Sequence, residues 1–196
     1  MLDKSIPYVG IIMRRTAGSP LPDATLPPGY GFVYFKNGDE KDWARIETSV
    51  LEFDDEMDAL LYFQKDFIAF LPETERRCLF IQNPEGEKVA TGTAWWAYDG
   101  VKRVPLLHWI AVKPQYQDMG LGKAVSAQVL RLICEIEGDR DVYLSTQTWS
   151  HRAVAIYRQM GFQIVKEKTK IGHYENDKYE VAIDVLRSLG PRFSDL

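Results

Sequence analysis

Two glycines at the start of a predicted helix have a spacing that would suit the binding of a phosphate group. An apolar strand ends at Val112, a turn follows, and Gly120 and Gly122 stand where a helical pattern begins. Free N–H groups at a helix N-terminus carry partial positive charge and can bind a pyrophosphate, and glycine lets the phosphate approach them closely. The same glycines could simply permit a tight turn, so this pattern alone leaves both interpretations open.

Two other phosphate-binding motifs do not fit this turn. A Walker loop needs glycine five places before Gly122 and Ser or Thr after the Gly-Lys pair, but these positions hold Gln117 and Ala124. A dinucleotide-binding fingerprint needs Gly or Ala where Val125 stands, and a first glycine immediately after the strand. The turn is therefore neither of these.

The turn does resemble the Gln/Arg-x-x-Gly-x-Gly/Ala motif of the GNAT superfamily of acetyl-CoA-dependent N-acetyltransferases, and here it reads Gln117-Asp118-Met119-Gly120-Leu121-Gly122. A second segment is similar to the later family signature Asn-x-x-Ala-x-x-Leu-Tyr-x-x-x-Gly-Phe. It runs from Ser150 through Ala153, Tyr157 and Gly161 to Phe162, with Ser150 in place of the usual Asn. The motifs cover residues 106–162, and the order of elements extends the resemblance over residues 32–185.

The resemblance implies a binding site for acetyl-CoA. Backbone N–H groups of residues 117–123 would bind the pyrophosphate, and Lys123 would either assist electrostatically or lie in solvent. The strand that contains Ile110, Ala111 and Val112 would diverge from residues 142–146 and admit the pantetheine arm. From the second motif, Ser150 and Ala153 would contact the cofactor. The implied cofactor-binding set is Ile110, Ala111, Val112, Gln117, Asp118, Met119, Gly120, Leu121, Gly122, Lys123, Ser150 and Ala153.

Acetyl transfer to an amine needs a base, an oxyanion donor and a proton for the leaving thiolate, since an alkylammonium has a pKa of about 10. By the resemblance, Tyr157 would protonate the CoA sulfur, although it could be an ordinary core aromatic. His108 is similarly placed to a histidine of arylalkylamine N-acetyltransferases and would act as base or proton relay. It could equally be structural, because Leu106 stands where relatives have a second histidine or a Glu. We expect direct transfer rather than an acetyl-enzyme.

The acceptor pocket of the family is built from three segments, which here are rich in acidic and aromatic residues. An acidic loop beside aromatic rings would suit a cationic or aromatic amine, although helix capping and strand packing also explain these residues. The three histidines show no metal-ligand spacing, so we expect no metal. The acceptor candidates are Glu52, Phe53, Asp54, Asp55, Glu56, Trp95, Trp96, Tyr98, His173 and Tyr174.

The elements predicted to position these residues form a mixed α/β fold. We expect a largely antiparallel sheet with helices on both faces, in which residues 1–29 form an N-terminal arm with a possible extra strand and residues 30–196 form the acetyltransferase domain. Apolar residues from Met57 to Ile68 predict a helix over residues 55–70 that ends at Leu71-Pro72. A final strand is expected over residues 179–185.

Composition limits the classes of partner. Of 196 residues, 45% are hydrophobic, and the formal net charge is −4, which favours a packed domain and disfavours nonspecific nucleic-acid binding. With two cysteines and neither a leader-like start nor a membrane-length apolar run, we expect a cytoplasmic protein that binds no membrane. The acceptor is a small-molecule amine or a protein or peptide amine, and a homodimer is possible by the resemblance.

Two other functions stay open at this point. The chain could be a non-catalytic module of the same fold that binds or senses acyl-CoA, because Leu106 and Ser150 depart from the family pattern. It could also be a structural domain in which the glycine turn is vestigial.

Overall fold

The computed structural model describes residues 2–196. These residues divide into two compact units, which we describe separately. The first unit contains Pro22–Trp95 and Leu107–Ile133, and the second contains Leu2–Leu21, Trp96–Leu106 and Cys134–Leu196. Strands β4 (Lys88–Asp99) and β5 (Lys102–Val112) contribute residues to both units.

The sheet of the first unit has the strand order β2-β3-β4-β5. Strand β2 (Gly31–Tyr34) pairs antiparallel with β3 (Cys78–Gln82), with Phe32 opposite Ile81. Strand β3 pairs antiparallel with β4, with Phe80 opposite Thr91. β3 is almost entirely buried because its side chains are apolar on both faces.

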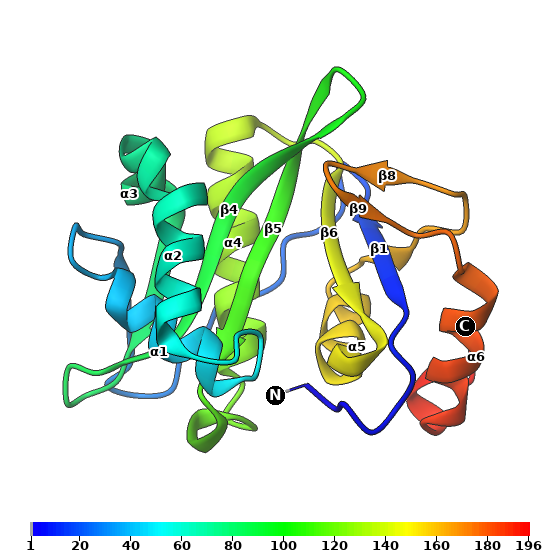
Figure 1. Cartoon of the computed structure of the whole chain (residues 1–196), viewed down its shortest axis with the longest axis horizontal. Coiled ribbons are helices and arrows are strands. Elements are labelled where there is room, and N and C mark those ends of the chain that lie inside the picture. Colours follow the sequence, from blue (N-terminus) through cyan, green and yellow to red (C-terminus); the bar gives the residue numbers. More distant parts are fainter. Residues whose placement is uncertain (1) are drawn as a thin grey trace. The chain divides into compact units, whose positions relative to one another are not determined.

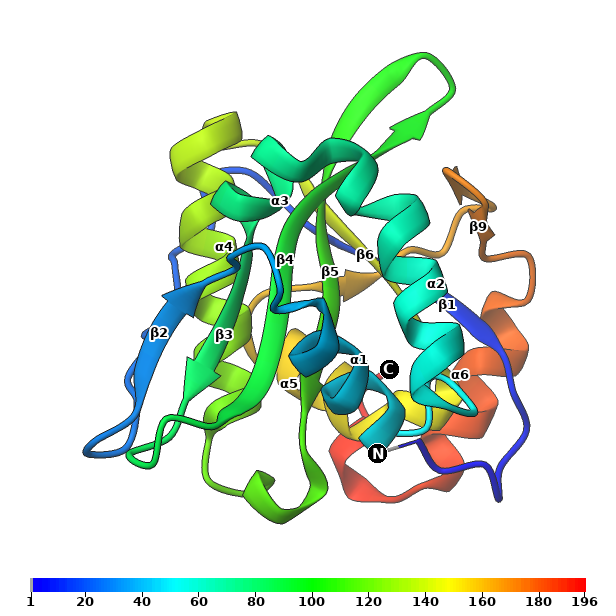
Figure 2. The ribbon, with the colours of Figure 1, turned by 60° about the vertical axis from the view of Figure 1, so that its left-hand side comes forward.

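Helices cover both faces of this sheet, as Figure 2 shows for α1 (Glu40–Ser49) and α2 (Glu56–Asp66) on one side and α4 (Leu121–Glu137) on the other. Successive side chains of β4 point to opposite faces of the sheet, so the strand packs against helices on both of its faces. A Cβ on Gly92 would lie 2.9 Å from Val129 Cγ2 of α4, so α4 packs directly on the strand there. Three residues along, Trp95 points to the other face, where its ring centroid lies 4.9 Å from that of Phe67.

The predicted helix over residues 55–70 is wrong at its C-terminal end. Helix α2 begins as expected, because Asp55 accepts hydrogen bonds from the N–H groups of Met57 and Asp58 at 2.8 and 2.9 Å. After the short helix η1 (Ile68–Phe70), a further helix α3 (Leu71–Arg77) follows instead of a break. Pro72 lies in its first turn, where a missing N–H costs nothing.

The apolar stripe predicted for α2 is only partly buried. Ala59 and Phe63 are buried, whereas the side chains of Met57 and Leu61 are 63% and 56% exposed. Hydrophobic spacing therefore located this helix correctly but overestimated how much of its surface is covered.

The sheet of the second unit has the strand order β5-β6-β1-β7, and Figure 1 shows β6 beside β1. Strand β6 (Val142–Gln147) pairs parallel with β5 at Leu106 and Tyr143, and antiparallel with β1 (Gly10–Arg15), where Ile12 lies opposite Ser145. β1 also pairs antiparallel with β7 (Gln163–Ile164). Strands β8 (Lys170–Ile171) and β9 (Tyr174–Glu175) form a separate hairpin. The remaining helical segments are η3 (Thr148–Ser150), α5 (His151–Gln159), α6 (Tyr179–Ser188) and η4 (Pro191–Phe193).

The predicted final strand is also wrong, because residues 179–185 lie in α6. The buried residues of α6 are Ala182, Ile183 and Leu186, whose spacing of one, three and four residues is helical rather than alternating. Strand β1, from the segment predicted to be an arm with a possible extra strand, lies between β6 and β7. The expected class, a mixed α/β protein with a largely antiparallel sheet and helices, is confirmed.

Candidate active site

The turn between β5 and α4 is braced by Gln117. After β5 ends at Val112, the 3₁₀ turn η2 (Pro114–Tyr116) follows, and the Gln117 N–H donates to the Pro114 carbonyl at 3.2 Å. The Gln117 side chain donates through Nε2 to the Val112 carbonyl at 3.0 Å. Gln117 thus ties the turn to the end of the strand, and its own backbone amide is already used within the protein.

The helix after this turn begins with a short stretch of amides that lie ahead of its hydrogen-bonded ladder. The first helical bond runs from the Ala124 N–H to the Gly120 carbonyl at 3.0 Å, so the N–H groups of residues 120–123 precede it and lack partners within the helix. The chain enters this stretch with left-handed φ values of 64° at Asp118 and 81° at Gly120. A Cβ on Gly120 would meet no atom of residues 2–196 within 4 Å, so the space there is open within the described chain.

A polar cluster at the foot of the turn was not anticipated from the sequence. Glu87 accepts from Lys113 Nζ at 2.6 Å and from the Tyr116 hydroxyl at 2.7 Å, and these bonds lower its pKa. Lys113 is therefore neutralised by Glu87, whereas Lys123 is exposed in the first turn of α4. Glu87 lies in the turn between β3 and β4, far from Lys113 in the sequence, so no local sequence pattern indicates this cluster.

Strand β5 is kinked next to the proposed base. Trp109 has a left-handed φ of 48°, which is strained for a bulky residue. Because of this kink, the rings of His108 and Trp109 both meet the aromatic side chains of α1 and α2, although consecutive residues of a regular strand face opposite ways. The His108 ring centroid lies 6.4 Å from that of Phe67, and the Trp109 centroid lies 5.2 Å from that of Trp43. Ile110 returns to the other face, under Gly92.

The connection between α1 and α2 lies against the same kink. Phe53 stacks on Trp109 with ring centroids 5.4 Å apart and planes at 23°. Asp55 serves as the N-cap of α2, so for this residue the structural role is established. The structure thus brings part of the predicted acidic loop together with His108 and Trp109 in the first unit.

The residues of the second motif lie in the second unit. Tyr157 is 6% exposed on α5 and packs edge-to-face on Phe162, with ring centroids 6.0 Å apart. Ser150 is the N-cap of α5, and its hydroxyl accepts from Gln147 Nε2 at 3.3 Å rather than capping the helix. Ala153 is half-buried in the first turn of α5.

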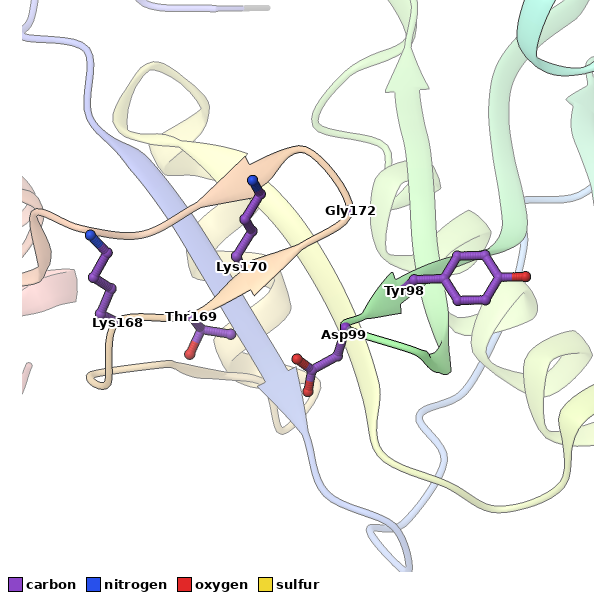
Figure 3. A pocket seen from close by; sticks show the side chains of 7 residues that line it. Tyr98, Asp99, Lys168, Thr169, Lys170 and Gly172 are labelled. Carbon is purple, nitrogen blue, oxygen red and sulfur yellow. The ribbon is translucent and has the colours of Figure 1, made fainter.

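Other predicted acceptor residues line hollows of the second unit. His173 and Tyr174 border a pocket of about 270 Å³, together with Tyr8 of the N-terminal arm and Ser145 of β6. Tyr98 borders a second hollow of about 470 Å³, with Asp99, Lys168 and Lys170 (Figure 3). The labelled side chains of that hollow point in different directions.

The two tryptophans of β4 are accounted for by packing. Trp95 is buried beside Phe67. Trp96 lies under the guanidinium of Arg103, which is 4.6 Å from its ring centroid.

The residues that flank the second motif hold the N-terminal arm. The Trp149 indole donates to the Ile6 carbonyl at 2.7 Å, and His151 Nε2 lies 3.6 Å from the Asp3 carboxylate. Burial lowers the pKa of His151, and Asp3 only partly opposes this effect. These side chains therefore have structural partners.

Among residues 2–196, no three His, Cys, Asp or Glu side chains come together as a metal-binding group. Nor does any helix in this range have the length and apolar character needed to cross a membrane.

Comparison with known proteins identifies the fold. The GCN5-related N-acetyltransferase structure from Sphaerobacter thermophilus superimposes with a TM-score of 0.62 at 18% identity, over 82% of this chain and 49% of that one. The mycothiol acetyltransferase of Streptomyces coelicolor is 26% identical over 152 residues, which cover 77% of this chain and 48% of that protein. N-acetyltransferase family 8 member 3 of Mus musculus is 34% identical over 122 residues, 61% of this chain and 53% of that protein.

The chain thus spans about half the length of these three proteins. The expected GNAT fold is confirmed by the structural likeness. The sequence profile of the acetyltransferase (GNAT) family matches residues 40–162, which is more than half of the chain. The chain therefore belongs to the acetyltransferase (GNAT) family.

Proposed function

We propose that this protein transfers an acetyl group from acetyl-CoA directly to a primary amine. The observation that carries the proposal is the row of N–H groups at residues 120–123, which precede the first helical bond of α4 and open onto free space at Gly120. Such a row binds the pyrophosphate of a CoA thioester. Asp118, Met119 and the exposed Lys123 flank it, while Gln117 holds the turn in shape.

The rest of the reaction is assigned to β5 and α5. The neutral amine attacks the thioester carbonyl, the new N–C bond forms and the C–S bond breaks. His108 takes the amine proton, directly or through water, and Tyr157 protonates the departing thiolate. We assign stabilisation of the oxyanion to a backbone N–H of β5, at Ile110 or Ala111. In this proposal Val112 and these two residues belong to the strand segment that binds the pantetheine arm, and the second motif contributes Ser150 and Ala153 as cofactor-binding residues.

Both cysteines support direct transfer over an acetyl-enzyme intermediate. Cys78 is fully buried, and burial raises the pKa of its thiol to about 12. Burial also raises the pKa of Cys134, which is half-buried on α4. A thiol nucleophile must be accessible and at least partly deprotonated, so neither residue suits that role.

The cofactor assignment is tested with two glycines at opposite ends of α4. Gly120 and Gly138 both have left-handed φ values, 81° and 78°, and a Cβ on either would meet nothing within 4 Å. Gly120→Val and Gly138→Val should therefore lose similar stability, about 1–2 kcal/mol, because both force a β-branched residue into left-handed backbone.

Only Gly120→Val should also weaken acetyl-CoA binding, by at least about tenfold in calorimetry, because only its new side chain stands in front of the amides. Equal affinities in the two variants would remove the pyrophosphate site from this turn.

The second candidate function is an acyl-CoA sensor without turnover. The replacement of the usual Asn by Ser150, whose hydroxyl is occupied by Gln147, favours it. Thiol release in the presence of amines separates the two functions, because a sensor binds acetyl-CoA without releasing CoA.

A further inference from the structure

Three half-buried rings of the first unit form what we call the aromatic wall: Phe53, Tyr62 and Trp109. Trp109 stacks on Phe53 with centroids 5.4 Å apart and meets Tyr62 edge-on at 5.0 Å. Behind them the fully buried Trp43 contacts all three rings, with centroid distances of 5.2–6.2 Å. The wall is thus a rigid aromatic surface that adjoins His108 on β5.

The rim of the aromatic wall is strongly acidic. Residues 52–58 contain five carboxylates and no basic residue. Arg45 reaches this segment from α1, with its Nε 3.9 Å from Glu56, while it also pairs with Asp42 at 3.1 Å. Asp55 is engaged as a helix cap. Glu52 and Asp54, which flank Phe53, are exposed beside the rings.

Next to this rim lies one further carboxyl group, which belongs to α1 and not to the loop. Glu47 is 1% exposed at the C-terminal turn of α1, and its Oε1 has no hydrogen-bond partner among residues 2–196. Burial, and after it the nearby Glu52 carboxylate, raise the pKa of Glu47. The indole N–H of Trp43, one turn earlier on the same face of α1, is likewise buried without a partner in the described chain. A buried carboxyl oxygen under a repelling carboxylate is an environment that a positive ligand charge would stabilise.

We propose that the amine acceptor is a diamine or polyamine, whose second cationic group lies against the aromatic wall between Glu52 and Asp54. This inference rests on the proposed acetyl transfer. The reacting amine must be neutral to attack, so a charge that persists throughout the reaction has to be at the other end of the molecule. Ring faces and carboxylates together are the groups that bind an alkylammonium.

The hollows of the second unit lack this excess of negative charge. In the smaller one, Glu175 is already paired with Lys168 at 3.1 Å, and Lys178 balances Asp177. The larger one contains Lys168 and Lys170 beside Asp99 (Figure 3). Neither would favour a second cation.

Three acceptors with the same five-carbon chain test the proposal. They are 1,5-diaminopentane, pentylamine and 5-aminopentan-1-ol. CoA release measured with the full chain should give a kcat/KM for the diamine at least about tenfold above both monoamines, the effect of one well-placed charge contact. The preference should shrink at high salt, because the carboxylates are exposed. Equal kcat/KM values for the three amines would overturn the proposal.

Charge-neutralising variants locate the site. Glu52→Gln and Asp54→Asn should each lower kcat/KM for the diamine about three- to tenfold, mainly through KM, and lower the value for pentylamine by a clearly smaller factor. Glu75→Gln, an exposed acid on α3, is the matched control and should change neither value. If Glu52→Gln and Asp54→Asn behave like Glu75→Gln, the second charge is not bound here.

The outcome also distinguishes this inference from the proposed function. Turnover of all three amines with equal kcat/KM would contradict the diamine specificity but would still support acetyl transfer. If acetyl-CoA binds but no amine releases CoA, or if acetyl-CoA does not bind, both proposals fall.

Discussion

At the scale of single residues, Glu47 is the most unusual group in the first unit. Its carboxyl is buried with one oxygen unpaired, and burial raises its pKa. The unfolded chain binds this proton less tightly than the folded protein does. The free energy of unfolding contributed by Glu47 therefore falls as pH rises from about 4.3, the ordinary value, towards the raised folded-state pKa.

Glu47→Gln should remove this dependence, because an amide cannot ionise. The variant should gain stability relative to the parent between pH 5 and pH 8, by up to about 1.4 kcal/mol for each pH unit within the range between the two pKa values. Urea unfolding at several pH values measures the difference. Glu75→Gln, an exposed substitution, should give a curve parallel to the parent, and a parallel curve for Glu47→Gln would contradict the argument.

Tyr157→Phe tests the proposed proton donor, also at the residue scale. Tyr157 is 6% exposed, and phenylalanine keeps its ring packing on Phe162. We expect kcat to fall roughly 10²- to 10⁴-fold, as for the loss of a general acid, with the acetyl-CoA Kd nearly unchanged. Tyr34→Phe, at an exposed tyrosine of β2 with no assigned role, is the control. An unchanged kcat, or equal losses in kcat and affinity, would remove the acid role.

Local sequence was sufficient to find the residues of the two motifs but not the groups around them. Gly120, Tyr157 and His108 stand out because their neighbours along the chain form a recognisable spacing. Glu87, which accepts hydrogen bonds from Lys113 and Tyr116, comes from a segment distant from both in the sequence. The environment of Glu47 likewise depends on the contact between α1 and the loop that follows it. Such contacts leave no periodic signal.

At the scale of elements, the approach of α4 to β4 depends on one missing side chain. A Cβ on Gly92 would lie 2.7 Å from Ile110 Cδ1 and 2.9 Å from Val129 Cγ2. Both distances are below van der Waals contact, so any larger residue forces the helix or the neighbouring strand to move. Since α4 carries the amides of residues 120–123, this packing also fixes the proposed cofactor site.

Gly92→Ala should therefore destabilise the protein by about 1–3 kcal/mol, the usual cost of overpacking a core. Gly31→Ala is the matched control, because it lies in β2 of the same sheet and a Cβ there meets nothing within 4 Å. Thermal or urea unfolding of the two variants provides the comparison. Equal stabilities would show that α4 moves away from β4 at little cost.

Element prediction failed where two patterns compete. Residues 179–185 include the β-branched Val181, Ile183 and Val185, which favour a strand, yet the buried positions Ala182, Ile183 and Leu186 follow a helical spacing. Leu71-Pro72 reads as a helix stop, but proline also suits the first turn of a new helix, α3. The sequence predicts an apolar strand that ends at Val112, whereas the kink of β5 at Trp109 carries no proline or glycine signal.

At the scale of the whole molecule, the segment before β1 is bound to η3, the short helix that precedes α5. The Asp3 N–H donates to the Trp149 carbonyl at 2.9 Å, and the Val9 N–H donates to the Thr148 hydroxyl at 2.9 Å. That hydroxyl in turn donates to the Pro7 carbonyl. Both ends of the described chain thus contribute to the second unit, and the boundary near residue 30 stays a prediction.

Thr148→Val should weaken this attachment. Thr148 is 0% exposed and Val9 is buried, so the substitution leaves the Val9 N–H without its partner, at a cost of about 1–3 kcal/mol for the unsatisfied group. Amide hydrogen exchange in residues 9–15 should become faster. Thr16→Val, an exposed substitution just after β1, should leave it unchanged. Unaltered exchange in Thr148→Val would show that the strand is held by its pairing with β6 alone.

The place of β1 in the sheet has a consequence for how the protein is made. β1 leaves the ribosome first, but its partners β6 and β7 begin only at Val142 and Gln163. At roughly 10 residues per second, synthesis of the intervening chain takes on the order of ten seconds. Throughout that time β1 has both edges unpaired, so Gly10–Arg15 stays open to pairing with a wrong strand until β6 has been made.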